Sequence, residues 1–387
     1  MPQMLISEIF PPLHGGSGRW FFEVYRRLEP EKFVMVVQKQ GQSTDYLDEN
    51  YPQKIYRCDL HVDQRIVSNW TSLRRYAEIC RELHSIMLTN EVVGIHAARP
   101  LHEGLLARWL FFRHRIPYLC FVHGEDVNVA MTSRELTFIT ASVLKHSHRI
   151  VANSHFTVNL LRNDWNISSN KIVLMHPGID CSMYHPGHEA AVENSFGSRS
   201  LILLTVGRLD ERKGHDSVIR SVHRLRDKYP GLVYVIAGDG GYLNPLKQMV
   251  ANLNLEERVR FLGAVDDKEL ASLYQKCDIF VLANRAVGRD SEGFGIVLLE
   301  AQATAKPVIT GSDGGTGDAM IPEVTGFRVN CQDPENPAEL AQAIDLLLES
   351  PQLRSSMGQR GREFVLDKFD WSRVSKFANQ VLSNPNM

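Results

Sequence analysis

The architecture of this chain follows from the segment Glu292-Gly-Phe-Gly-Ile-Val-Leu-Leu-Glu300-Ala301. An apolar run at 278–283, which predicts a strand, and a polar loop at 284–291 come before it. From Glu292 to about Ala305 apolar residues fall on nearly every side of a helix, so we predict that this helix is buried. A strand followed by a buried helix is typical of an α/β sheet.

The start of this predicted helix is a prepared anion site. The first N–H groups of a helix have no partner within it, and they carry the positive end of the helix dipole. We therefore expect the turn from Gly293 to Val297 to bind phosphate, and Gly293 and Gly295 to let the backbone approach a ligand closely. Glu300 lies among apolar residues, where an unpaired carboxylate is costly, so it needs a partner.

Two interpretations of these glutamates are open. Glu292 alone could be a solvated loop residue and Glu300 a member of an internal salt bridge, because structural ion pairs are the commoner reason for such carboxylates. The complete segment, however, resembles the signature of retaining nucleotide-sugar glycosyltransferases of family 4, which have the two-domain GT-B fold. The resemblance implies that Glu292 contacts the donor sugar and that Glu300 holds the ribose hydroxyls. It assigns sugar and phosphate contacts to the backbone of Phe294, Gly295 and Ile296. Gly293 and Val297, at the two ends of the expected anion site, complete the predicted donor-binding residues of this segment.

Composition sets the broad class of the protein. The chain has 387 residues, 43% of them apolar and 23% charged, which suits a soluble globular protein with two domains. Its net charge of −2 argues against general nucleic-acid binding. The cysteines form no C-x-x-C pair, and neither a signal peptide nor a spanning segment is recognisable. We expect a cytoplasmic protein, with any membrane contact peripheral and on the inner face.

Strand and helix patterns alternate along the whole chain. In the first half, apolar runs at 4–9, 33–37, 92–97, 117–122, 149–152 and 172–175 predict strands, and helical patterns, including one over 69–88, lie between them. A linker rich in turn residues at 176–186 precedes a second series, with strands at 201–206, 232–237, 259–262, 278–283 and 307–310. This alternation predicts parallel sheets covered on both faces.

The predicted fold class is therefore α/β, with two doubly wound, Rossmann-like domains facing each other across a cleft. The first domain covers residues 1–175 and the second covers 176–369. By the resemblance, residues 370–387 cross back to the first domain, which binds the acceptor, while the second binds the nucleotide sugar. Open parallel sheets bind ligands beyond the carboxyl ends of their strands, so both sites are expected there.

Two motifs in the first domain follow predicted strands. A glycine-rich turn, His14-Gly15-Gly16-Ser17-Gly18, comes after the first strand, where glycines often serve only the turn. His123 directly follows the strand at 117–122, and a lone histidine is usually structural. The resemblance implies that Gly15 and Gly16 let donor phosphate and acceptor come close, and that His123 contacts the donor sugar without transferring a proton.

Basic residues follow the first strand of the second domain, in Gly207-Arg-Leu-Asp-Glu-Arg-Lys-Gly214. We interpret Arg212 as solvated surface. Arg208 and Lys213 can reach back over the strand end to a diphosphate, the arginine as a fork and the lysine as a point charge. This pair matches the phosphate clamp of the family, with Gly207 beside it. The loop at Gly263 and Val265 would hold the nucleobase through its backbone.

The segment Leu105 to Arg115 has two interpretations. Aromatic residues alternate there with arginines, which suits a membrane surface, but a helix that packs its apolar face on the sheet has the same pattern. We favour the packed helix and keep a peripheral membrane contact of the first domain as the alternative.

The function implied by the resemblance is retaining transfer of a hexose from a nucleotide diphosphate sugar to a saccharide or lipid-linked acceptor, in polysaccharide or glycoconjugate synthesis. UDP-glucose is the preferred donor and GDP-mannose the alternative. We find no D-x-D motif or His/Cys cluster, so we expect no metal, and no cofactor besides the nucleotide sugar as co-substrate. The catalytic group would be Arg208, Lys213, Glu292 and His123. A UDP-sugar epimerase on the same fold and a non-catalytic sugar-binding protein are the competing interpretations.

Overall fold

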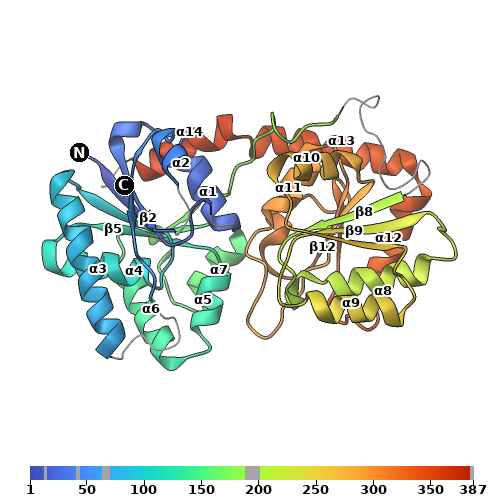
Figure 1. Ribbon diagram of the computed structural model, residues 1–387, viewed down its shortest axis with the longest axis horizontal. Coiled ribbons are helices and arrows are strands. Elements are labelled where there is room, and N and C mark those ends of the chain that lie inside the picture. The colour runs from blue at the N-terminus through green and yellow to red at the C-terminus, as the bar shows by residue number, and fades with distance from the viewer. Residues whose placement is uncertain (13–14, 41–43, 63–69, 188–200, 384–387) are drawn as a thin grey trace. The chain divides into compact units, whose positions relative to one another are not determined.

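The computed structural model describes residues 1–12, 15–40, 44–62, 70–187 and 201–383 (Figure 1). His14 of the glycine-rich turn and Asn69, the first residue of the helix predicted over 69–88, lie outside these ranges. The chain forms two compact units. The first combines Met1–Gly178 with Trp371–Met387, and the second is Ile179–Asp370.

The first unit contains a parallel sheet in the order β3-β2-β1-β4-β5-β6-β7. From β1 the order runs to β3 in one direction, and from β4 to β7 in the other, so the direction of winding changes between the neighbours β1 and β4. The strands are β1 (Gln3–Ser7), β2 (Phe33–Gln38), β3 (Lys54–Cys58), β4 (Gly94–Ala97), β5 (Tyr118–Val122), β6 (Arg149–Ala152) and β7 (Ile172–Leu174).

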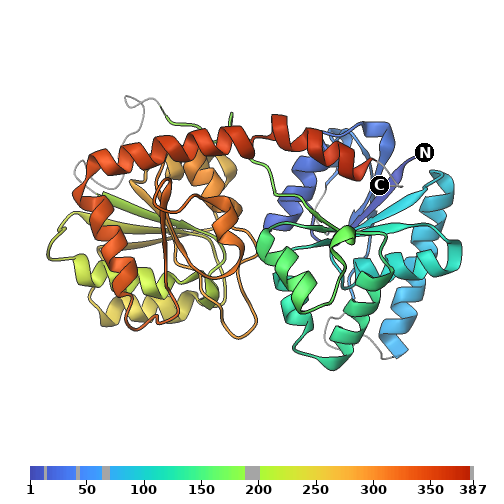
Figure 2. The same ribbon diagram turned by 180° about the vertical axis from the view of Figure 1, so that it is seen from behind.

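Helices cover both faces of this sheet. Figures 1 and 2 show α3, α4 and α6 on one face and α1 and α14 on the other. The side chains under α3, α4 and α6 form a single core cluster with those of the strands. The helices are α1 (Gly16–Tyr25), α2 (Asp45–Glu49), α3 (Trp70–Thr89), α4 (Glu103–His114), α5 (Glu125–Ala130), α6 (Arg134–His146), α7 (His155–Asn163) and α14 (Trp371–Leu382), with 3-10 turns η1 (Pro30–Lys32) and η2 (Ser169–Lys171).

The second unit repeats this plan with the parallel order β10-β9-β8-β11-β12-β13. Here the winding changes direction between β8 and β11, which are hydrogen-bonded neighbours. The strands are β8 (Leu201–Val206), β9 (Leu232–Ala237), β10 (Val259–Gly263), β11 (Ile279–Leu282), β12 (Val308–Gly311) and β13 (Gly326–Val329). The helices are α8 (His215–Leu225), α9 (Leu243–Asn252), α10 (Asp267–Lys276), α11 (Ile296–Ala303), α12 (Ala338–Glu349) and α13 (Pro351–Lys368), with η4 (Glu211–Lys213) and η5 (Gly314–Ala319).

Two parallel Rossmann-like sheets were expected, and both are present. The edge strands β3 and β13 were not predicted, because they are partly exposed and include charged residues, so neither forms a continuous apolar run. The helix predicted from Glu292 begins later, at Ile296, because Gly295 has a left-handed backbone with φ of 85°. Residues 292–295 are therefore a loop ahead of α11.

The structure also shows how exposed the cysteines are and how apolar the helices are. All six cysteines are buried and unpaired. Among the described residues, no helix is both long enough and apolar enough to cross a bilayer.

Candidate functional site

The candidate site of the second unit lies where its winding changes direction. The loop after β8 contains Gly207 to Gly214, and the loop after β11 runs from residue 284 to 295. Because β8 and β11 are parallel neighbours, their carboxyl ends lie at the same edge of the sheet, and the two loops meet there. Ligands of doubly wound sheets bind at such an edge.

One carboxylate joins the two loops. Oε2 of Glu292 accepts from Nζ of Lys213 at 2.5 Å and from Nη1 of Arg212 at 2.7 Å. Burial alone would raise the pKa of Glu292, but the charges of Lys213 and Arg212 and their hydrogen bonds lower it to about 2. Glu292 is therefore an anion at neutral pH, and it holds both cations at the carboxyl ends of β8 and β11.

The interpretation of Arg212 as solvated surface is wrong. Its side chain is only 4% exposed, and its Nε also lies 3.2 Å from Oδ2 of Asp290. An arginine directly before a lysine on a short turn looks solvated from its neighbours in sequence. Its partners, Asp290 and Glu292, lie about 80 residues further along the chain, so local polarity gives no sign of them.

A second ion pair fastens the loop after β11 to the first turn of α8. Arg285, just after β11, donates through Nη1 and Nη2 to the two carboxylate oxygens of Asp216, both at 2.8 Å. Its backbone N–H donates to the carbonyl of Arg212 at 2.9 Å. Arg285 and Asp216 are both buried. A forked, buried pair of this kind holds the loop rigidly, which fixes where Glu292 stands relative to Lys213.

Arg208 has a different environment from Lys213. Its side chain is 63% exposed, and its Nε lies 3.5 Å from Oδ2 of Asp210. Gly207 before it has a φ of 149°, and a Cβ there would come within 3.8 Å of Cε of Lys213. Lys213 is thus enclosed beside Gly207, while the guanidinium of Arg208 lies at the surface, where it can turn toward a ligand.

The loop before α11 is held by a glycine-rich turn that the sequence analysis missed. The N–H of Gly315, in η5 after β12, donates to the carbonyl of Glu292 at 2.8 Å. A Cβ at Gly314 would lie 2.2 Å from that same carbonyl oxygen. The signal was available, because a Gly-Gly pair in the short turn after an apolar strand often marks a close backbone approach.

The residues from Gly293 to Val297 lead into α11. Phe294 is buried and its ring lies 6.0 Å from that of Phe369, so it anchors the loop in the core. Ile296 and Val297, at the start of the helix, are half-buried. The helix start is therefore partly accessible, as a ligand site requires.

Glu300 lies further along α11 and is buried. Its Oε2 accepts from the hydroxyl of Tyr274 at 2.6 Å, so the partner that Glu300 was expected to need is supplied by α10.

The predicted nucleobase loop follows β10, the edge strand beside β9. Gly263 ends β10 with a φ of 71°, and its carbonyl accepts from the N–H of Gly238 at 2.7 Å. Val265, just beyond it, is half-buried.

The other predicted site residues belong to the first unit. His123 directly follows β5, and its Nε2 donates to the carbonyl of Ala98 at 3.0 Å. Its ring meets those of Trp20 and Phe21 edge-on, each at 5.6 Å. Burial lowers the pKa of His123, against the opposing effect of Asp126, so the ring is neutral at pH 7 with its proton on Nε2. A neutral ring with fixed orientation suits hydrogen bonding more than proton transfer.

The glycine-rich turn also belongs to the first unit. Gly15 and Gly16 are exposed where α1 begins, and the carbonyl of Gly15 accepts from the N–H of Arg19 at 3.0 Å. A Cβ at Gly15 would lie 3.2 Å from Cγ2 of Ile9. The turn therefore presents bare backbone to the solvent.

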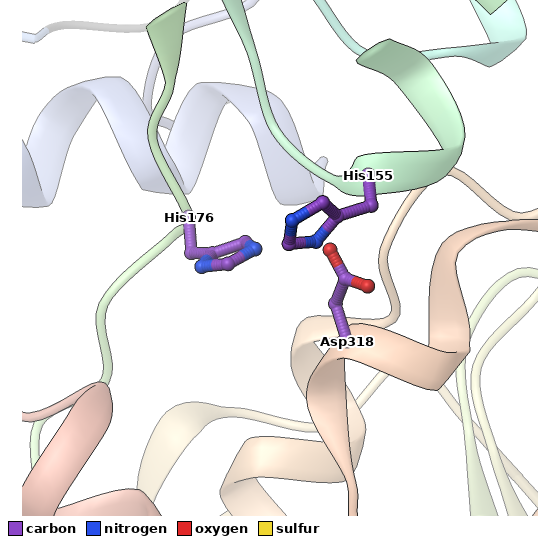
Figure 3. A group of neighbouring side chains, drawn as sticks. All are labelled: His155, His176 and Asp318. Carbon is purple, nitrogen blue, oxygen red and sulfur yellow. The ribbon is translucent and has the colours of Figure 1, made fainter. Parts of the chain in front are cut away.

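Two histidines lie close together in the same unit. The rings of His155, which begins α7, and His176, after β7, have centroids 6.0 Å apart and are tilted by 52° (Figure 3). Protein zinc sites use about three or four ligands, so two imidazoles within this unit are not by themselves a metal site. The pair connects the end of the sheet to α7.

Two family models match the two parts of the chain. Residues 14–183 match the model described as Glycosyltransferase Family 4, and residues 189–364 match Glycosyl transferases group 1. A protein from Mycolicibacterium smegmatis is 27% identical over 98% of both chains, and it is named GDP-mannose-dependent alpha-(1-6)-phosphatidylinositol monomannoside mannosyltransferase.

Solved structures share the whole architecture. The sucrose-phosphate synthase of Thermosynechococcus elongatus superposes with a TM-score of 0.85 at 21% identity, over 98% of both chains. HepE of Anabaena, solved in complex with UDP, superposes with a TM-score of 0.81 at 18% identity, over 99% of this chain and 100% of the other. At these identities the likeness shows the fold.

Proposed function

Because this chain belongs to the group 1 and family 4 glycosyltransferases, with the GT-B fold, we propose that it transfers a hexose from a nucleoside diphosphate sugar to an acceptor hydroxyl with retention of anomeric configuration. The observation that carries the proposal is the contact of Lys213 and Arg212 with Glu292 where the winding of the second sheet changes direction. It fixes two cations at the edge where such sheets bind ligands.

In this proposal the departing diphosphate is stabilised by charge already in place. As the glycosidic bond breaks, negative charge grows on the diphosphate, and Lys213, Arg208 and the first N–H groups of α11 supply positive potential. Glu292, held as an anion, keeps Lys213 positioned and offers its carboxylate to hydroxyls of the donor sugar. His123 offers a hydrogen bond to the same sugar, and no residue needs to form a covalent intermediate.

The nucleoside would be bound further along the same edge. Glu300 accepts hydrogen bonds from the ribose hydroxyls, with Tyr274 orienting its carboxylate. The backbone at Gly263 and Val265 holds the base. The roles of Gly15, Gly16 and Gly207 are to admit phosphate oxygens close to the backbone.

The names of the relatives bear on the donor. A relative that matches 98% of this chain is named for GDP-mannose, whereas a structure solved with UDP is only 18% identical to it. We therefore propose GDP-mannose as the first donor to test and UDP-glucose as the second. An assay that offers both donors to the enzyme with a panel of acceptors decides between them by which nucleoside diphosphate is released.

That assay also tests the class of reaction. Release of nucleotide together with a glycosylated acceptor supports the transferase, and determining the anomeric configuration by NMR tests retention. If UDP-sugar incubated alone gives an epimer, the enzyme is an epimerase, and binding without any turnover indicates a sugar-binding protein.

We further propose that transfer needs no divalent metal. The charge that Mg²⁺ would neutralise is met by Arg208, Lys213 and the start of α11, all within the second unit. Full activity in excess EDTA is the expected result. Loss of activity that added Mg²⁺ or Mn²⁺ restores would overturn both this proposal and the roles of the two cations.

A lipid-linked acceptor is the proposed acceptor class, as in the name of the full-length relative. One face of α4 packs on the sheet through Leu106 and Leu110, but Trp109 and Phe112 are exposed. The guanidinium of Arg108 lies 4.8 Å from the ring of Phe112. Exposed aromatic rings beside basic groups suit the surface of an anionic bilayer.

Vesicle binding tests this acceptor surface. The double variant Trp109→Ser/Phe112→Ser should lose sedimentation with vesicles that contain anionic lipid and keep its activity on a water-soluble acceptor. Leu366→Ser, which changes an exposed apolar residue of the second unit, is the matched control. Equal binding by the double variant and the control would remove α4 from the membrane surface.

A further inference from the structure

The first unit has its own ionic cluster where the direction of winding changes. Glu8 directly follows β1, Arg99 lies two residues after the end of β4, and β1 and β4 are parallel neighbours. Glu103 begins α4, just beyond Arg99. We call these three side chains, together with His61 at the rim, the acidic cluster. It lies at the edge where open α/β sheets bind their ligands, and the donor site assigned above does not use it.

The cluster is built around one guanidinium. Nη2 of Arg99 lies 2.6 Å from Oε2 of Glu8 and 3.1 Å from Oε1 of Glu103. The same oxygen of Glu103 accepts from the backbone N–H of Glu8 at 3.0 Å. Oε1 of Glu8 lies 3.0 Å from Nδ1 of His61. Glu8, Arg99 and Glu103 are therefore each held in place by two contacts.

The side chains of the acidic cluster differ in how much of each is exposed. The side chain of Glu103 is 1% exposed, that of Glu8 is 14% and that of Arg99 is 19%. Glu103 is thus the buried support, while Glu8 and Arg99 reach the surface. Among the described residues, Oε2 of Glu103 has no hydrogen-bond partner although it is buried. A buried polar atom left in this state is rare in folded proteins and is found at functional sites.

The acidic cluster adjoins the residue proposed to contact the donor sugar. Ala98 lies between β4 and Arg99, and its carbonyl accepts the proton on Nε2 of His123. The backbone that carries Arg99 therefore also orients His123. A molecule bound to Glu8 and Arg99 would lie at the same sheet edge as His123, because β1, β4 and β5 are parallel neighbours.

Charge selects the kind of molecule. Two carboxylates share one guanidinium, so Glu8, Glu103 and Arg99 together have a net charge of about −1, and burial lowers the pKa of the nearby His102. A phosphate would be repelled. Hydroxyl groups fit, because each can donate to the carboxylate of Glu8 and accept from the guanidinium of Arg99.

We propose that Glu8 and Arg99 bind hydroxyl groups of the acceptor, and that the part of the acceptor held there is an uncharged polyol or sugar ring. The proposal rests on the function proposed above. It deepens that function by naming the chemical class of the acceptor and the residues that hold it.

Four small probes test the proposal: methyl α-D-mannopyranoside and myo-inositol, which are uncharged, and the phosphates of the same two rings. Ligand-observed NMR with the nucleotide-loaded protein measures their binding. At least one uncharged ring should bind, at least about tenfold more tightly than its phosphate. In Glu8→Gln, which keeps the shape and loses the charge, this binding should weaken by about 10- to 100-fold. Arg99→Lys, which keeps the charge and loses the fork, should weaken it as well.

The matched control is Asp48→Asn. Asp48 forms a forked pair with Arg57 in the same unit, at 2.7 and 2.9 Å, with similar burial. It should leave binding of the rings unchanged. Nucleotide affinity, measured by calorimetry, should be the same in all four proteins.

The outcomes separate this proposal from the proposed function. If the wild-type protein binds nucleotide but neither uncharged ring, or prefers the phosphates, the assignment of Glu8 and Arg99 is overturned. Unchanged ring binding in Glu8→Gln overturns it too. If the wild-type protein binds neither GDP nor UDP, the glycosyltransferase function itself fails.

Discussion

The two units use a similar construction with a different balance of charge. In each unit, an ion cluster joins residues that follow the first strand in sequence to residues that follow its neighbour across the change in winding. In the second unit, two cations, Lys213 and Arg212, meet on one carboxylate, Glu292. In the first, two carboxylates, Glu8 and Glu103, meet on one guanidinium, Arg99.

This difference teaches how one architecture can serve two ligands. A doubly wound sheet provides a ligand site where its strand ends converge, but the fold does not determine which ligand binds. We propose that the charged groups of each cluster select the ligand. In the second unit, Lys213 and Arg212 are matched by Glu292 and Asp290, and Lys213 and the exposed Arg208 are the cations proposed to meet the diphosphate. In the first unit, a surplus of one negative charge suits hydroxyl groups.

Removing a cation from the second unit tests this comparison most strongly. Lys213→Ala should lower kcat by about 100- to 1000-fold with a smaller change in KM for the donor, because its charge matters most as the diphosphate departs. Steady-state kinetics over a range of donor concentrations measure both constants. A rise in KM alone, at unchanged kcat, would mean that Lys213 binds the ground state as strongly as the transition state.

A change at Glu300 tests whether the nucleoside binds at the same sheet edge as Lys213 and Glu292. Glu300→Gln keeps the shape and removes charge-assisted hydrogen bonds, so the dissociation constant for the nucleoside diphosphate should rise about 10- to 100-fold. Calorimetry with GDP and UDP is the measurement, and Tyr274→Phe, which loses only the orienting hydroxyl, should have a smaller effect. Unchanged affinity of Glu300→Gln for both nucleotides would place the ribose elsewhere.

Arg212 sharpens the comparison, because it is the second cation on Glu292 and no motif singled it out. Arg212→Ala should lower kcat by about tenfold. Lys213 still pairs with Glu292, but the carboxylate loses the hydrogen bond from Arg212 and is held less firmly. Arg212→Lys should recover part of the loss. Lys228→Ala, which removes an exposed ion pair of the same unit, is the control for general charge effects. Equal kinetics in Arg212→Ala and wild type would make its contact purely structural.

The smallest expected effect is on stability against acid. The pKa of Glu292 is lowered to about 2 in the folded protein from a value near 4.5 when unfolded, so its ionised form stabilises the fold above about pH 4.5. That contribution, on the order of 2 kcal/mol, is lost as the pH falls toward 2. The urea midpoint of Glu292→Gln should therefore be below that of wild type at pH 7 and approach it near pH 3. A gap that does not narrow would contradict the ion pair.

Much of this fold could be predicted from apolar runs and their spacing, because buried parallel strands have a strong local signal. The edge strands β3 and β13 have a weaker signal. The position of α11 was misplaced by one turn because a single dihedral angle, at Gly295, decides where the helix starts.

The ion clusters could not be predicted from local pattern. Glu8 and Arg99 are 91 residues apart in sequence, and Lys213 and Glu292 are 79 apart. Lys213 and Glu292 entered the predicted site only through a family resemblance, which is dense in the second half of the chain. Glu8, Arg99 and Arg212 match no motif, so only the topology of the sheets brings them together with their partners.

The buried cysteines have a practical consequence for spectroscopy. Burial raises the pKa of Cys58, Cys80, Cys181, Cys277 and Cys331 to about 12, and that of Cys120 further still. Thiols of this kind contain almost no thiolate at pH 7, so maleimide dyes react with them slowly. Cysteines introduced into the wild-type chain can therefore be labelled with little reaction at the native cysteines. One exposed cysteine introduced into each unit would take a donor and an acceptor fluorophore, and energy transfer between them would follow the two units through a catalytic cycle.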